Sequence, residues 1–157
     1  MTPMPLREAI SARLACQLDS VMFLLNGCTK AALERRTNGK WSALDNLAHL
    51  ARYHEVFLAR IEQIVNEDKP RLPSYRAEED PEWPAWMNLE VFEVVARLQS
   101  RQRRLIDTLE QLSPEQLNRI GVHSRYGEMT LELWVEFFLL HEAHHLYVIL
   151  QRLRESN

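Results

Sequence analysis

Two histidines lie where a buried helix face would ordinarily carry apolar side chains. His141 and His145 are four residues apart in the apolar segment 133–150, so on a helix they stack one turn apart on the same face. Burying two imidazoles is unfavourable unless each finds a polar partner. A divalent metal ion would serve both, because neutral imidazoles at positions i and i+4 direct two nitrogen atoms toward one point.

A third histidine belongs to the same hypothesis. His49 lies in another apolar helical segment, among Leu44, Leu47, Leu50 and Tyr53. Facing helices of a bundle can direct their side chains to a single ion. Three histidines without a fourth protein ligand would leave coordination positions open for water or substrate, which is typical of a catalytic site. The alternative is that each imidazole is a buried residue bonded to a carbonyl or hydroxyl group.

The segment from His141 to His145 also matches HExxH, the zinc peptidase pattern in which the glutamate is the general base. No third ligand follows at a suitable distance and no edge strand is predicted, so we do not expect a peptidase. Glu142 is a candidate for a water-activating base near the metal, and His123, in a loop, is a candidate for a proton carrier. His54 lies about 140° around the helix from His49 and is expected to face solvent. His144 is expected on the helix flank.

Helices must position these residues. Apolar residues at three- and four-residue steps predict long helices over about 6–25, 43–66, 89–112 and 130–154. Ser42 is the expected N-cap of the second, with Asp45 completing a capping box. With four glycines and no alternating β-branched runs, a large sheet is not expected. We therefore predict an all-α protein, a single four-helix-bundle domain over residues 1–157.

Two connectors join the predicted helices. The connector 69–88 holds four of the seven prolines together with Trp83 and Trp86. Twenty extended residues can span about 65 Å, whereas a 25-residue helix is about 38 Å long. The connector can therefore run along the whole bundle, making the helices on either side of it parallel, with its tryptophans packed on the core. The second connector, 117–129, is expected to form a hairpin or an ordered loop over the mouth of the bundle.

Composition excludes other classes of protein. The net charge is −3, with 19 Lys and Arg against 22 Asp and Glu, which argues against a nucleic-acid partner. Glycine-rich phosphate loops are absent from the sequence. No apolar run is long enough for a membrane span, and the first residues lack the layout of a secretory signal. Cys16 and Cys28 form no CxxC motif, and we expect reduced thiols in a cytoplasmic protein.

Several segments resemble the DinB superfamily, the DinB/YfiT-like metalloenzymes. They are residues 41–50 (Trp-Ser-Ala-Leu-Asp-Asn-Leu-Ala-His-Leu), Glu55, Arg60, residues 68–75, the stretch 121–131 and residues 141–146. The resemblance implies a four-helix bundle of up-down-down-up topology, a metal held by His49, His141 and His145, and a homodimer. The chain departs from its relatives at Glu142, where they often carry Asp, and at positions 147–148, where they often carry Gln-Ile.

The resemblance also implies an activity. Relatives with known activities transfer low-molecular-weight thiols such as bacillithiol or use mycothiol, and their metals are zinc, nickel, manganese or iron. We expect a divalent metal, zinc or nickel first, that lowers the pKa of a bound thiol or water. S-transfer from such a thiol and metal-dependent hydrolysis of a small-molecule substrate both stay open. The alternative is a non-catalytic stress-response or interaction bundle with a structural metal or none.

Overall fold

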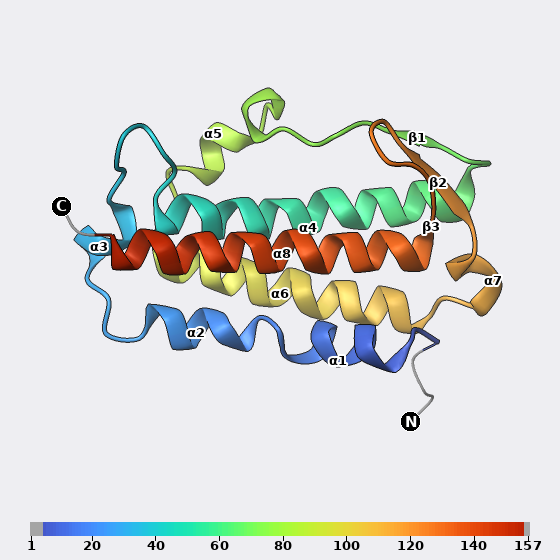
Figure 1. Ribbon diagram of the computed structural model, residues 1–157, viewed down its shortest axis with the longest axis horizontal. Helices are drawn as coiled ribbons and strands as arrows, with labels where there is room; N and C mark the ends of the chain where they lie inside the picture. Colours follow the sequence, from blue (N-terminus) through green and yellow to red (C-terminus); the bar gives the residue numbers. More distant parts are fainter. Residues whose placement is uncertain (1–4, 156–157) are drawn as a thin grey trace.

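The computed structural model describes residues 5–155, and long helices lie side by side in it (Figure 1). They are α1 (Glu8–Cys16) followed by α2 (Asp19–Leu25), α4 (Ala43–Asn66), α6 (Val91–Glu110) and α8 (Leu131–Arg154). The shorter elements are α3 (Lys30–Glu34), the 3-10 helix η1 (Ala77–Glu79), α5 (Trp83–Trp86) and α7 (Pro114–Leu117). The predicted helical bundle is confirmed. None of the helices in the described range is long and apolar enough to cross a membrane.

The prediction of one continuous helix over residues 6–25 is wrong, because the helix breaks after Cys16. Beyond this point the backbone bonds tighten from i→i+4 to i→i+3, since Ser20 donates to the carbonyl of Gln17 and Val21 to that of Leu18. The Gln17 side chain is at the same time fixed to α8, where its amide donates to the carbonyl of Leu139 at 3.0 Å. The break therefore brings a polar side chain against a neighbouring helix.

The helix that carries His49 begins as predicted. The hydroxyl of Ser42 accepts the backbone N–H of Asp45, and the Asp45 carboxylate accepts the backbone N–H of Ser42, both at 2.9 Å. Arg36 donates two further hydrogen bonds to this carboxylate, at 2.7 and 2.8 Å. This capping box fixes the first turn of α4, two turns before His49.

The connector between α4 and α6 returns along the bundle (Figure 1). Trp83 and Trp86 are buried, which confirms that these side chains hold the connector against the core. The carboxylate of Asp80 accepts hydrogen bonds from Arg52 of α4 and from the hydroxyl of Tyr75, each at 2.7 Å. The connector is thus ordered by both apolar and ionic contacts.

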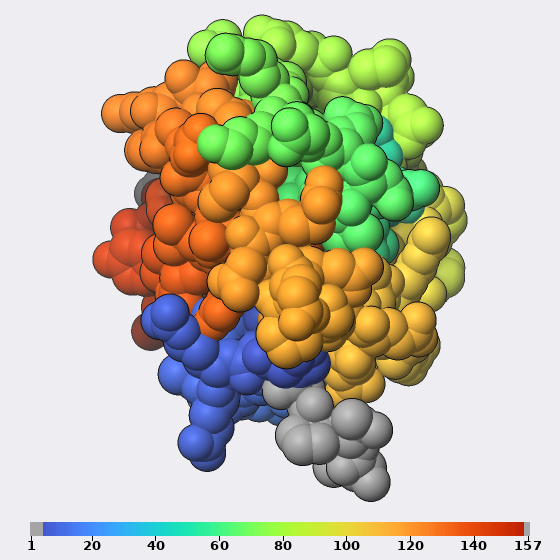
Figure 2. All heavy atoms as spheres, turned by 90° about the vertical axis from the view of Figure 1, so that its right-hand side faces the viewer, coloured from blue at the N-terminus to red at the C-terminus, as the bar shows by residue number. Residues whose placement is uncertain are grey.

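The second connector forms a hairpin of β2 (Ile120–His123) and β3 (Gly127–Thr130), and β1 (Arg71–Leu72) of the first connector pairs with β2 in parallel. Viewed toward one end of the bundle, these segments lie together over that end (Figure 2). Gly121 fits where a larger residue would not, because an added Cβ would lie 2.8 Å from the side chains of Ile64 and Trp134. This close approach seats the hairpin on the bundle.

The core consists of two apolar clusters separated by a polar layer. One cluster is centred on Phe57, Leu105 and Phe138, and the other includes Leu47, Leu98 and Ile149. Where the helices pass from one cluster to the other, they carry buried or part-buried polar side chains. These are Gln17 after α1, His54 on α4, Gln102 on α6 and Glu142 on α8.

Candidate metal centre

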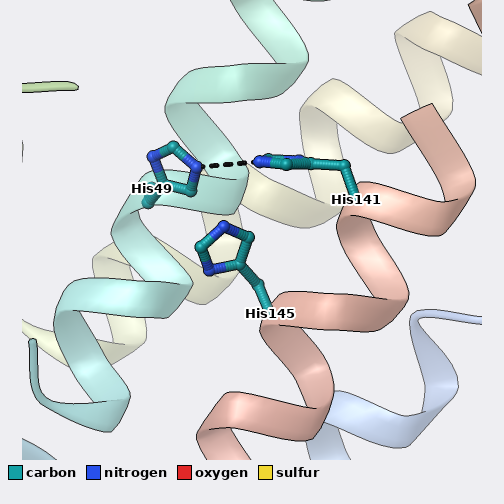
Figure 3. Close-up of side chains that lie close together, drawn as sticks. All are labelled: His49, His141 and His145. Carbon is teal, nitrogen blue, oxygen red and sulfur yellow. Dashed lines mark hydrogen bonds between the residues drawn. The ribbon is translucent and has the colours of Figure 1, made fainter. Parts of the chain in front are cut away.

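The three histidines predicted as ligands converge between α4 and α8 (Figure 3). The Nε2 atoms of His49 and His141 are 3.1 Å apart. One ligand atom from each of the three rings lies within 4.8 Å of the other two. The i,i+4 pair on α8 and the single histidine on α4 therefore face one point, as the sequence pattern requires.

Asn46 determines which nitrogen of His145 is available to a metal. The Asn46 amide nitrogen donates to the carbonyl of Ser42 at 2.8 Å, so its Oδ1 atom is the one that faces His145. An amide oxygen can only accept, and Nδ1 of His145 must therefore carry the proton of their 2.8 Å hydrogen bond. The lone pair of His145 is then on Nε2. Outer hydrogen bonds of this kind orient metal-binding histidines in many proteins.

The other two rings have no such partner. The Nδ1 atoms of His49 and His141 are buried without a hydrogen-bond partner in the described part of the chain. Their Nε2 atoms face each other. Because zinc–nitrogen bonds are about 2.0–2.1 Å long, two nitrogens on one ion lie within about 4.2 Å of each other. The 3.1 Å separation of the His49 and His141 nitrogens satisfies this condition, and three imidazoles are a donor set that suits a divalent transition-metal ion.

Burial keeps all three imidazoles neutral. It lowers the pKa of His49 to about 3, with a smaller effect from His145. It lowers the pKa of His141 to about 2, assisted by His145 and His49, and that of His145 to about 4, assisted by His144. The neutral form is the one that binds a metal ion, so no proton has to be displaced from these rings at neutral pH.

Aromatic rings surround His49 and limit the access of water. The ring centroid of Trp41 lies 5.1 Å from that of His49, and that of Tyr75 lies at 5.7 Å. Trp83 of the connector is at 6.1 Å, and Tyr53 packs at 4.2 Å from His141. The connector thus forms a wall of the site as well as a link between helices.

A cavity of about 140 Å³ borders His141 on the side of the hairpin. His123 lines it and is buried. Its Nδ1 atom accepts the backbone N–H groups of Arg125 and Tyr126, at 3.0 and 3.2 Å, so its proton is on Nε2. Burial, followed by the charges of Arg60 and Arg125, lowers the pKa of His123. The structure therefore places this loop histidine beside the three-histidine site.

Comparison with known proteins identifies the family. The sequence model of the DinB superfamily matches residues 16–149. The chain belongs to the DinB superfamily. Its fold is similar to that of YfiT from Bacillus subtilis, which is described as a probable metal-dependent hydrolase with an unusual four-helix bundle topology. The TM-score is 0.78 at 20% sequence identity, over 98% of this chain and 92% of that one. No curated protein matches the chain.

In this DinB-superfamily protein, Glu142 is not part of the three-histidine cluster. Its side chain is fully buried in the polar layer. Oε1 accepts a hydrogen bond from Gln17 at 2.9 Å, and Oε2 lies 3.5 Å from Nε2 of His54. Burial raises the pKa of Glu142 to about 7, although the hydrogen bond from Gln17 opposes this effect. Its suggested role as a water-activating base stays a prediction, with no contact to the three histidines among the described residues.

The prediction that His54 faces solvent is wrong, because its side chain is fully buried. Its Nδ1 atom is 2.7 Å from the carbonyl oxygen of Leu50, and its Nε2 atom is 2.8 Å from Oε1 of Gln102 on α6. The helical wheel assumed one buried face, whereas α4 packs on both α6 and α8 and has buried residues on more than one side. His144 is exposed on the flank of α8, as expected.

Sequence reasoning missed Asn46 as a member of this DinB-superfamily site. A signal was present, because Asn46 precedes His49 by three residues and therefore shares its face of the helix. Tyr75 and Arg60 were also missed as lining residues. Their positions depend on how the connector and the hairpin pack, which residue spacing does not encode.

Proposed function

We propose that this protein is a metal-dependent hydrolase of a small-molecule substrate, with a divalent ion held by His49, His141 and His145. The observation that carries the proposal is the convergence of three neutral, largely buried imidazoles at one point. The description of YfiT supports the same reaction class. Zinc or nickel suits the three imidazoles, with manganese and iron as alternatives.

The residues of the chain have separate tasks in this proposal. A bound ion would supply Lewis-acid chemistry, which lowers the pKa of a coordinated water or thiol. Asn46 keeps the lone pair of His145 on Nε2. The rings of Trp41, Tyr53 and Tyr75 restrict water around the histidines. His123 presents a neutral N–H group at the neighbouring cavity, where it can donate a hydrogen bond to a substrate oxygen.

Metal content tests the site. Protein purified without a histidine tag or chelator is expected to contain close to one equivalent of metal. A His141→Ala, His145→Ala double variant is expected to lose it. His144→Ala is the matched control, because His144 is an exposed histidine of the same helix. Equal trace metal in the wild type and the double variant would remove the proposal.

Chelation distinguishes an enzyme from a non-catalytic bundle with a structural metal. A structural ion couples metal loss to unfolding, whereas a catalytic ion leaves a folded apoprotein. We expect the circular dichroism spectrum of the wild type to persist after chelation. Unfolding on chelation would favour the alternative of a stress-response or interaction module.

Thiol S-transfer is the second reaction that the proposed ion would support, since an open coordination position accepts a thiol as well as water. Cys16 and Cys28 do not line the cavity, so the thiol would be a separate low-molecular-weight molecule. A screen of esters, amides and alkyl halides distinguishes hydrolysis from thiol S-transfer. It uses the metal-loaded protein with and without added cysteine. Turnover without thiol supports hydrolysis, and turnover only with thiol supports S-transfer.

We also propose a homodimer formed through α8. Leu133, Leu140 and Tyr147 are seven residues apart on this helix and are 47%, 59% and 61% exposed. This spacing places them along one side of α8, where apolar side chains favour self-association. Leu140→Lys is expected to shift the mass measured by light scattering from dimer to monomer. Phe92→Lys, at an exposed apolar position on α6, is the control.

The up-down-down-up topology and the cytoplasmic location are proposals as well. The topology is supported by the connector that returns along the bundle before α6 begins (Figure 1). The location is supported by the free cysteines Cys16 and Cys28.

A further inference from the structure

Arg60 of α4 is a buried cation without an acidic partner. It is 6% exposed, and its guanidinium donates to neutral groups, the hydroxyl of Tyr53 at 3.3 Å and the carbonyl of Pro73 at 2.5 Å. No carboxylate in the described residues forms an ion pair with it. Arg52, two turns earlier on the same helix and less deeply buried, pairs with both Asp80 and Glu55.

An uncompensated buried charge is unfavourable, and buried arginines are normally paired. The fold nevertheless keeps Arg60 in place, with its guanidinium carbon 5.5 Å from the ring centroid of Trp134 and 5.9 Å from that of Tyr53. These contacts hold the group without neutralising it. An anionic ligand would supply the missing counter-charge.

The cavity beside His141 is where such a charge would enter. Arg60 and Arg125 both line it, together with His123 and Tyr53, and no acidic side chain does. The hydroxyl of Tyr53 accepts from Arg60, and its own proton has no acceptor among the described residues. His123 adds a neutral Nε2–H group. The cavity thus offers hydrogen-bond donors and positive charge at its wall.

We propose that this cavity binds a carboxylate group of the substrate, with Arg60 as the residue that determines this specificity. A guanidinium forms paired hydrogen bonds to a carboxylate in one plane. A phosphate group carries a charge of about −1.5 to −2 at pH 7, more than Arg60 balances alone, and Arg125, the other arginine of the cavity, is exposed to solvent. The volume of about 140 Å³ is enough for a small acid. The inference rests on the proposed function, in which the reaction would take place at a metal held by the neighbouring histidines.

Binding of butyrate and of its neutral analogue butyramide tests the proposal without an activity assay. The shifts of the backbone amide resonances of residues 121–127 are followed by NMR during titration of metal-free and zinc-loaded protein, at constant ionic strength. Butyrate is expected to cause saturable shifts in both forms, and butyramide none at the same concentration. Inorganic phosphate is expected to bind more weakly than butyrate.

Variants assign the effect to Arg60. Arg60→Met keeps a side chain of similar length and is expected to weaken butyrate binding at least tenfold, about the effect of one charged hydrogen bond. Arg125→Gln, at an exposed position, is expected to weaken it about twofold to fivefold. Arg103→Met is the matched control, because Arg103 is an exposed arginine of α6 outside the cavity. It is expected to bind butyrate like the wild type.

Several results would overturn the proposal. They are equal binding of butyrate and butyramide, wild-type affinity in folded Arg60→Met, absence of saturable shifts at about 100 mM butyrate, or tighter binding of phosphate. Butyrate that binds only the zinc form, independently of Arg60, would be a metal ligand and would equally refute it. If Arg60→Met does not fold, the proposal is tested by the affinity of Arg125→Gln and by the comparison of butyrate with butyramide in the wild type. Absence of stoichiometric metal would refute the proposed function. The titration of the metal-free protein would still show whether the cavity binds a carboxylate.

Discussion

Replacement of Asn46 by alanine is expected to weaken metal binding while leaving all three histidines in place. The variant loses the acceptor of the 2.8 Å hydrogen bond from Nδ1 of His145. The ring can then rotate or move its proton to Nε2, the nitrogen that faces the other histidines. Loss of an outer hydrogen bond to a metal ligand typically lowers affinity about 10–100-fold. This corresponds to about 1.4–2.7 kcal/mol of binding free energy.

Competition for zinc against a chromophoric chelator measures this effect. Asn66→Ala is the matched control, because Asn66 lies on the same helix and also donates to the carbonyl four residues earlier, at 2.9 Å, but is exposed at its far end. Asn46→Asp retains an acceptor for His145 and is expected to bind zinc at least as tightly as the wild type. If folded Asn46→Ala holds zinc with wild-type affinity, the assigned orientation of His145 is wrong.

Three further outcomes follow from the packing and the electrostatics. Gly121→Ala is expected to lower the free energy of unfolding in urea by about 1–3 kcal/mol, because the added Cβ meets Trp134 at 2.8 Å; unchanged stability would contradict the close contact. The pKa of Asp80 is about 2, since hydrogen bonds from Arg52 and Tyr75 outweigh the opposing effect of burial. The ionised carboxylate of Asp80 therefore contributes about 1–2 kcal/mol to the free energy of unfolding. This contribution is complete above pH 4 and is lost as the pH falls toward 2. Acid titration of unfolding should show a shallower loss in Asp80→Asn, and identical curves would refute the ion pair. Glu142→Gln is expected to keep the metal content of the wild type by elemental analysis, because Glu142 lies outside the cluster; loss of metal would place it at the ion.

The three-histidine cluster could be predicted because its pattern is mainly local. The spacing of His141 and His145 determines that they share a helix face wherever that helix packs. His49 required only that its apolar face turn inward. The capping box at Ser42 was predicted for the same reason, since Ser42 and Asp45 interact within a single turn.

What sequence reasoning missed depends on contacts between distant segments. The burial of His54 follows from α6 covering a second side of α4, and the break after Cys16 accompanies the contact of Gln17 with α8. The isolation of Arg60 is a property of the surrounding residues and cannot be inferred from the arginine alone. Charged residues are abundant along the chain, and only the fold decides which of them remain without a partner of opposite charge.

The polar layer between the two apolar clusters has a consequence for how accurately the helices are aligned. Apolar side chains tolerate sliding, because one leucine can replace another in the same gap. His54, Gln102 and Glu142 do not, since the hydrogen bond of His54 to Gln102 joins α4 to α6, and Glu142 of α8 accepts a hydrogen bond from Gln17 in the break after α1. If α8 shifted by one turn, about 5.4 Å, Glu142 would be buried among apolar side chains without its hydrogen bond. The polar layer therefore fixes the register of the helices along the bundle. The alignment of the three imidazoles depends in this way on residues outside their own cluster.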